Sequence, residues 1–133
     1  MKAVNAKITR AFQKESRIPV CDNSGAKVIR FIAPIGKKGR KGRHLYAGVG
    51  DMIVASVVSG TPEMKKQVVY AVIVRQKKEY RRKDGTRIAF EDNAAVVLKD
   101  DKGNPKGTLI KGPIAKEAAE KWPGIAKIAS MVV

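Results

Sequence analysis

The sequence predicts a mainly β fold, a small barrel or sandwich with a protruding hairpin and one short helix near the C-terminus. Short β-branched runs recur at regular spacing and are separated by turn residues, which is typical of such folds. Asp84-Gly85 lies between two extended runs, the strongest short signal for a hairpin. From Gly112 onward the composition changes to one that favours a helix.

Each expected strand is a run of β-branched and apolar residues that ends at a turn. Asp22, Asn23, Ser24 and Gly25 are all turn formers. The apolar run 68–74 is continuous rather than alternating, so we expect both faces of that strand to be covered. The expected strands are 26–33, 51–59, 67–80, 87–90, 93–100 and 108–112.

We expect a single domain over residues 1–133, because no composition shift marks a linker. Pro113 suits a first helical position and Pro123-Gly124 predicts the helix end, with 125–133 following as an apolar strand or tail. The expected parts are a lead-in (1–17), a barrel (18–111) that carries a basic loop (36–44) and the hairpin (67–98), and a C-terminal helix and tail (112–133).

The charge points to a polyanionic partner. Lys and Arg number 28 against 12 Asp and Glu, a formal net charge of +16. Such a charge opposes compaction, and a polyanion relieves the repulsion. Nucleic acid is the first candidate. A membrane surface is the second, but it predicts a basic amphipathic helix, and the one expected helix carries Glu117 and Glu120.

The sequence contains too few Cys and His residues, and too few apolar runs, for several functional classes. Cys21 and His44 are the only Cys and His, so no intrachain disulfide, Cys/His metal site or two-histidine triad forms. No apolar run reaches a membrane span, and the start lacks a signal-peptide core, so we expect a cytoplasmic location. No acid–base pair is marked by spacing, so we expect no enzyme, cofactor or small-molecule substrate. The catalytic candidates considered are Asp22, Ser24, His44, Asp51, Asp84 and Asp92.

The first candidate RNA-binding segment is the stretch 36–44. Its glycines allow close approach to a surface, and its cations then reach phosphates. It is no Walker A loop, because the Lys-Ser/Thr end is missing. A merely solvated loop and a localisation signal remain alternatives. The candidate residues are Lys37, Lys38, Arg40, Lys41, Arg43 and His44.

The second candidate segment is the hairpin. A two-residue turn at Asp84-Gly85 predicts that Arg82 lies opposite Arg87, a like-charge pair that destabilises a free sheet and that a phosphate relieves. The same register predicts Lys78 opposite Glu91 and Lys77 opposite Asp92. A solvated ribbon guarded by charges is the alternative. The candidate residues are Arg75, Lys77, Lys78, Arg81, Arg82, Lys83 and Arg87.

Four separated motifs carry a resemblance. In residues 71–98, a small residue, three aliphatics, a spacer, Asp84-Gly85, Phe90, Asn93 and two aliphatics follow in order. "DNSGA", "YAGVGD" and "GPIAKE" also occur, at 22–26, 46–51 and 112–117. Over residues 18–133 the chain resembles the family of universal large-subunit ribosomal protein fourteen, in its archaeal–eukaryotic branch. Residues 1–17 lie outside this resemblance.

The resemblance implies a small closed five-stranded barrel that serves as a structural constituent of the large ribosomal subunit and grips large-subunit (23S-type) ribosomal RNA. It implies a place at the intersubunit face, with bridges to small-subunit ribosomal RNA near Tyr46, Ala47, Gly48, Val49 and Gly50. Large-subunit ribosomal protein three is an implied neighbour. Anti-association initiation factor six is implied to dock near Lys116, Glu120 and Trp122.

Two alternatives stay open. A basic DNA-compacting barrel explains the charge and the size, although it does not explain the four motifs. Trp122 is interpreted as an anchor of the helix onto the barrel, whereas an exposed Trp at this position would mark an interface.

Overall fold

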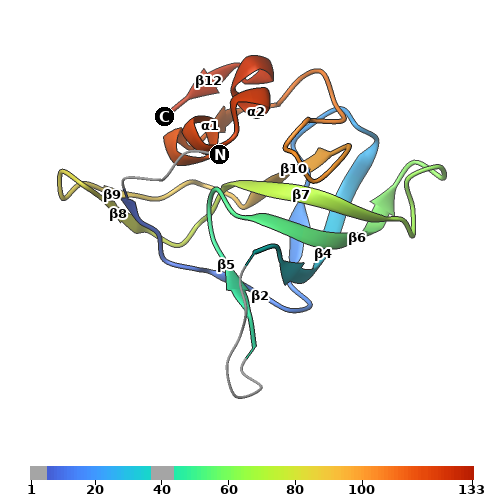
Figure 1. The fold of residues 1–133 in the computed structure, drawn as a ribbon, viewed down its shortest axis with the longest axis horizontal. Helices are drawn as coiled ribbons and strands as arrows, with labels where there is room; N and C mark the ends of the chain where they lie inside the picture. Colours follow the sequence, from blue (N-terminus) through green and yellow to red (C-terminus); the bar gives the residue numbers. More distant parts are fainter. Residues whose placement is uncertain (1–5, 37–43) are drawn as a thin grey trace.

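The structure is a computed structural model that describes residues 6–36 and 44–133. It shows a mainly β molecule with short helices packed at one side (Figure 1). The described residues form, in order, β1 (Ala6–Lys7), β2 (Phe12–Gln13), β3 (Arg17–Pro19), β4 (Ala26–Pro34), β5 (Tyr46–Ala47), β6 (Met52–Gly60), β7 (Val68–Arg75), β8 (Tyr80–Arg82), β9 (Arg87–Ile88), β10 (Ala94–Leu98), β11 (Pro113–Ile114), α1 (Lys116–Lys121), α2 (Pro123–Ile128) and β12 (Met131–Val132).

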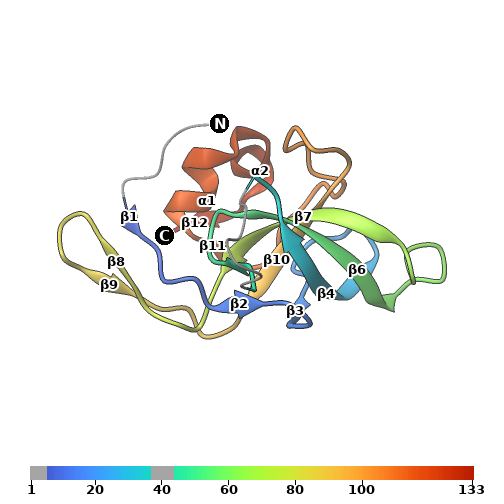
Figure 2. The same cartoon turned by 60° about the horizontal axis from the view of Figure 1, so that its bottom comes forward.

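The central sheet has five antiparallel strands in the order β10-β7-β6-β4-β3. It curls into a barrel-like body, so the predicted mainly β, barrel-like fold class is confirmed, whereas the described strands do not close the ring (Figure 2). The described strands leave the ring open between β3 and β10. There a single parallel bridge between Val20 and Ala95 spans the seam, with the Cys21 N–H donating to the Ala95 carbonyl at 3.1 Å.

Burial follows the sequence pattern. In β4, Ile29 and Phe31 are buried and Arg30 between them is exposed, as alternation requires. In β7 the last five residues are buried, and β10 is buried throughout. The C-terminal segment covers the outer face here, and the Ala115 N–H donates to the Val74 carbonyl at 3.0 Å. The prediction that both faces of the run 68–74 are covered holds for residues 71–74, whereas Val68 and Tyr70 at its start are exposed.

The hairpin corrects two predictions. The expected strand 67–80 is interrupted between β7 and β8, where the buried Gln76 amide donates to the carbonyls of Thr9 and Lys78. The turn holds three residues, 83–85, because the Gly85 N–H donates to the Arg82 carbonyl and the Arg82 N–H to the Thr86 carbonyl. Gly85 has φ +91°, the left-handed conformation such a turn requires.

The extra turn residue shifts the register by one. Arg81, not Arg82, lies directly opposite Arg87, and Tyr80 lies opposite Ile88. The predicted pairing of Lys77 with Asp92 is also wrong, because Asp92 pairs with Arg75. β1 adds a third strand to β8 and β9, and this small sheet projects from the barrel (Figures 1 and 2).

The C-terminal segment has more structure than the sequence predicts. Pro113 lies in β11, which pairs in parallel with β12, rather than in a helix. Pro123 starts α2 instead of ending the helical region, because a proline without an N–H suits the first turn. Among the described residues, no helix is long and apolar enough to cross a membrane.

Candidate nucleic-acid interface

The hairpin has an inward face that is fixed to the C-terminal segment. Glu117 on α1 is 3% exposed and accepts hydrogen bonds from the Tyr80 hydroxyl at 2.7 Å and from Arg82 Nε at 2.8 Å. Arg82 Nη2 donates to the Val133 carbonyl at 2.6 Å. Tyr80 and Arg82 are two residues apart on β8, so both side chains point to the same side. This face is therefore occupied by the protein itself.

The pKa values of Tyr80 and Arg82 are shifted by this burial and by the neighbouring carboxylate. Loss of solvent and the neighbouring Glu117 carboxylate raise the pKa of Tyr80 well above its ordinary value. For Arg82, burial lowers the pKa, but hydrogen bonds and charge from Glu117 outweigh it and the net pKa is raised. The phenol stays protonated and the guanidinium stays charged. The three groups form a neutralised structural cluster.

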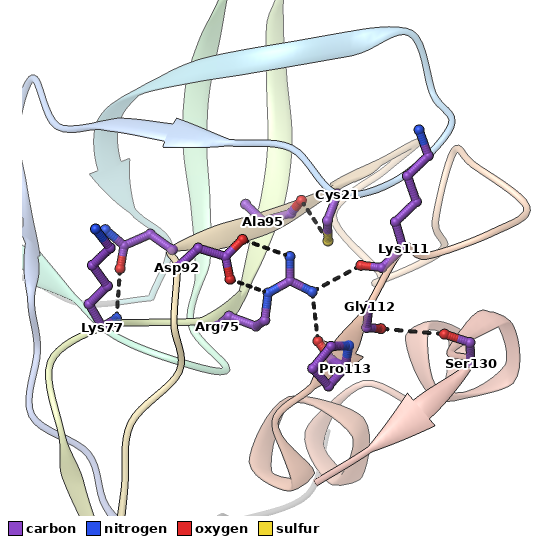
Figure 3. A network of polar contacts seen from close by, with 10 residues as sticks. Cys21, Arg75, Lys77, Asp92, Ala95, Lys111, Gly112, Pro113 and Ser130 are labelled. Atoms are coloured by element: carbon purple, nitrogen blue, oxygen red, sulfur yellow. Dashed lines mark hydrogen bonds and ion pairs between the residues drawn. The ribbon is translucent and has the colours of Figure 1, made fainter.

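Arg75 is also turned into the protein (Figure 3). The residue is 7% exposed, and its Nη1 donates to the carbonyls of Lys111 and Pro113 at 2.9 and 2.8 Å. Nη2 donates to Asp92 Oδ2 at 3.1 Å, and Nε lies 2.9 Å from Asp92 Oδ1. A Cβ on Gly112 would lie 2.7 Å from Nη1. Arg75 therefore joins the base of the hairpin to the start of the C-terminal segment.

The outward face of the hairpin is different. Arg81 lies opposite both Arg87 on β9 and Lys7 on β1, so three exposed cations form a row across the three strands. Glu79 lies 3.1 Å from Arg87 Nη1 and is the carboxylate paired with this row. The structure thus brings Arg81 and Arg87 together and adds Lys7, which the sequence analysis missed. No sequence signal marks Lys7, because strand pairing over 74 residues places it.

The other predicted RNA-binding residues do not belong to this row. His44, Lys77, Lys78 and Lys83 are exposed. The Lys77 N–H donates to Asn93 Oδ1 at the hairpin base, a backbone contact that leaves its ammonium group outside (Figure 3). Lys37, Lys38, Arg40, Lys41 and Arg43 lie outside the described residues.

The predicted intersubunit region, residues 46–50, presents one large side chain. Tyr46 is 48% exposed, whereas the four residues that follow are buried. The Gly48 N–H donates to Asp51 Oδ2 at 2.8 Å, and the Val49 N–H donates to Gln76 Oε1 at 3.1 Å. The segment is a fixed loop from which the Tyr46 ring projects.

The predicted docking residues of the helix divide in the same way. Lys116 and Glu120 are exposed and form an i,i+4 ion pair at 3.8 Å. Trp122 is 8% exposed, and its Nε1 donates to the Gly50 carbonyl at 2.8 Å. A Cβ on Gly103 would lie 2.6 Å from the indole ring. Trp122 is an anchor onto the barrel.

The catalytic candidates of the turn 22–25 are structural. Asp22 accepts from the Ser24 hydroxyl at 2.6 Å and from the Val97 N–H at 3.0 Å. Asn23 Oδ1 accepts from the N–H groups of Thr108 and Leu109. Burial raises the pKa of the Cys21 thiol to about 11, so it is unreactive at neutral pH. Within residues 6–36 and 44–133, no acidic, His or Cys group is arranged to hold a metal ion.

Comparison with known proteins places this geometry in a family context. The family model described as ribosomal protein L14p/L23e matches residues 11–133. The chain is 56% identical to the large ribosomal subunit protein uL14 of Nanoarchaeum equitans, 53% to that of Halobacterium salinarum and 48% to that of Methanocella arvoryzae. Each alignment covers all 133 residues and the full length of the relative. These relatives are archaeal, as the predicted branch requires.

Proposed function

The chain belongs to the ribosomal protein L14p/L23e family, and from this premise we propose that it is a structural constituent of the large ribosomal subunit that binds large-subunit ribosomal RNA in the cytoplasm. Members of this family are ribosomal proteins and not enzymes. The catalytic candidates Asp22 and Ser24 have structural contacts instead, because Asp22 accepts from the Val97 N–H and from the Ser24 hydroxyl.

The observation that carries the RNA-binding proposal is the division of the hairpin cations. The guanidinium groups of Arg75 and Arg82 are hydrogen-bonded to carboxylates and carbonyls of the protein. Arg81 and Arg87, in contrast, are exposed and lie directly opposite each other. Two like charges placed opposite each other on the surface destabilise the free fold, whereas they favour the binding of a polyanion. A ribosomal protein has such a polyanion beside it. The basic stretch 36–44 is proposed to contribute further phosphate contacts.

The finer parts of the proposal concern the assembled ribosome. The exposed Tyr46 is the side chain of residues 46–50 available to small-subunit ribosomal RNA across the interface. Lys116 and Glu120 are exposed on α1, where anti-association initiation factor six is proposed to dock. Trp122 is buried against the barrel, so we propose no direct contact of its indole with the factor. Large-subunit ribosomal protein three is proposed as a neighbour.

Sedimentation tests the proposal directly. Cell lysate is separated on a sucrose gradient before and after a high-salt wash, and the protein is followed by mass spectrometry. We expect co-migration with the large subunit and with joined ribosomes that survives the wash. Absence from the large-subunit fraction would overturn the proposal.

The alternative of a DNA-compacting barrel makes a different prediction. Such a protein binds any duplex with similar affinity through phosphate contacts alone. A ribosomal protein fits the shape of one folded RNA. Competition of large-subunit RNA against an equal mass of random duplex DNA separates the two. Equal competition would favour the DNA-compacting function.

A further inference from the structure

We propose that Lys7, Arg81 and Arg87 form one binding site for the phosphate backbone of ribosomal RNA, completed by the N-terminal strand β1. The inference rests on the proposed RNA binding and specifies where one contact is made. β1 precedes the residues that the family model matches, which begin at residue 11. The site therefore includes a strand outside the residues that the family model matches, although the relatives align with it as well.

Strand register places the three cations on one side of the sheet. Lys7 is the partner of Arg81 in the β1–β8 pair, and Arg81 is the partner of Arg87 in the β8–β9 pair. Directly opposite residues of antiparallel strands project to the same face, and neighbouring strands lie about 4.8 Å apart. Tyr80 and Arg82 project to the other face, toward Glu117. The row is therefore separated from the structural cluster by the sheet itself.

The net positive charge of this row favours the binding of an anion. Three cations directly opposite one another are destabilising in a free sheet. Glu79 pairs with Arg87 at 3.1 Å, so the row with this carboxylate keeps a charge of about +2 at neutral pH. Both Glu79 and Arg87 are half-exposed, and a surface pair of this kind contributes little. Within residues 6–36 and 44–133, Glu79 pairs with Arg87, and neither Arg81 nor Lys7 forms an ion pair, so a phosphate at these two cations displaces no carboxylate.

The shape and composition of the surface suit a nucleic-acid backbone. Lys7, Arg81 and Arg87 line a hollow of about 310 Å³ together with Ile8 and Thr9. Arg guanidinium groups bind phosphate through two parallel N–H donors, and Lys adds a point charge. Thr9 adds a hydroxyl. Protein interfaces have cores that are depleted of charge and rich in aromatic residues, and this hollow is the reverse.

Site-directed cleavage tests the site in the full chain. Lys7→Cys, Arg87→Cys and Lys65→Cys are made separately in a Cys21→Ala background, and an iron chelate is attached to each thiol. The proteins are assembled into large subunits reconstituted without the native protein, and strand breaks in the RNA are mapped. We expect breaks from positions 7 and 87 in the same short stretch of nucleotides. Position 65 belongs to the turn between β6 and β7, which lies across the molecule from β8 and β9 (Figure 1), so it should give a different pattern or none.

The outcomes separate this inference from the proposed function. If the proteins assemble and position 65 or 87 cleaves RNA while position 7 does not, the three-cation site is wrong and RNA binding stands. If positions 7 and 87 cleave different stretches, the site is likewise wrong. If no variant assembles and the wild-type protein also fails to bind, the proposed function itself fails.

Charge variants give an independent readout. Lys7→Gln should lower the slope of log affinity against log salt by about 0.7–0.9, the value of one phosphate contact. Lys65→Gln, which removes the same charge elsewhere, is the matched control and should change the slope less. Glu79→Gln removes the competing carboxylate and should raise affinity. A fall in affinity on Glu79→Gln, or equal effects of Lys7→Gln and Lys65→Gln, would overturn the site.

Discussion

The two faces of the β8–β9 hairpin both carry arginine, but in opposite surroundings. On one face Arg82 meets a buried carboxylate and the Tyr80 hydroxyl completes the cluster. On the other, one residue away, Arg81 meets Arg87 and Lys7. The difference teaches that the basic character of a segment does not identify its RNA-binding residues. The alternation of the strand turns Arg82 toward Glu117 and Arg81 away from it, and we propose that the second of these arginines meets RNA.

The largest effect is expected from removing the carboxylate of the inward face. Glu117→Ala leaves Arg82 and the Tyr80 hydroxyl without their partner, so unfolding free energy should fall by about 3–5 kcal/mol. Urea denaturation measures the change. Glu120→Ala on the same helix is the control and should change stability by less than about 0.5 kcal/mol, because Glu120 is exposed. Similar losses for the two variants would show that the cluster does not hold the hairpin.

A smaller loss is expected from Tyr80→Phe, which keeps the ring and removes one donor to Glu117. Unfolding free energy at neutral pH should fall by about 1–3 kcal/mol. Tyr46→Phe is the matched control, since Tyr46 is half-exposed. If Tyr80→Phe is as stable as the wild-type protein, the hydroxyl makes no net contribution to the inward face.

The sequence could predict much of this molecule, including its β class, its hairpin and its family. It could not predict the hairpin register, because Asp84-Gly85 suits both a two-residue and a three-residue turn, and one residue exchanges the faces. That single shift places Arg81 rather than Arg82 opposite Arg87. Lys7 could not be found either, because its position depends on tertiary pairing. Pro123 fits both a helix end and a helix start, and in the structure it starts α2 directly after Trp122, whose indole donates to the Gly50 carbonyl.

Alkaline pH should reduce the contribution of the inward face to the free energy of unfolding. The pKa of Tyr80 is raised in the folded protein above its ordinary value of 10.0. At a pH between the ordinary pKa of tyrosine and the raised pKa of Tyr80, the unfolded chain has lost the phenol proton that the folded chain keeps. The free energy of unfolding should therefore fall as the pH rises above about 10. Tyr80→Phe should show a shallower fall in parallel urea titrations. Equal falls would mean that Tyr80 is not held protonated by its surroundings.

Removal of a charge from the outward face should raise the free energy of unfolding, by less than the losses expected for the inward face. Arg81→Gln relieves two like-charge pairs, so the free protein should gain about 0.2–1 kcal/mol in unfolding free energy at low salt. The gain should shrink at about 1 M salt, where screening acts within about 3 Å. Thermal or urea unfolding at both salt concentrations checks it. A loss of stability at low salt would show that Arg81 serves the fold.

The most direct test compares Arg81→Gln with Arg82→Gln, two variants that remove the same charge from neighbouring residues. Each is measured for unfolding free energy and for the salt dependence of binding to large-subunit RNA, at a temperature where both are folded. We expect Arg82→Gln to lose about 1.5–3 kcal/mol of stability with its salt slope unchanged, and Arg81→Gln to lower the slope without losing stability. The reverse assignment, or equal effects on both quantities, would contradict the division of the hairpin into a structural face and an RNA-binding face.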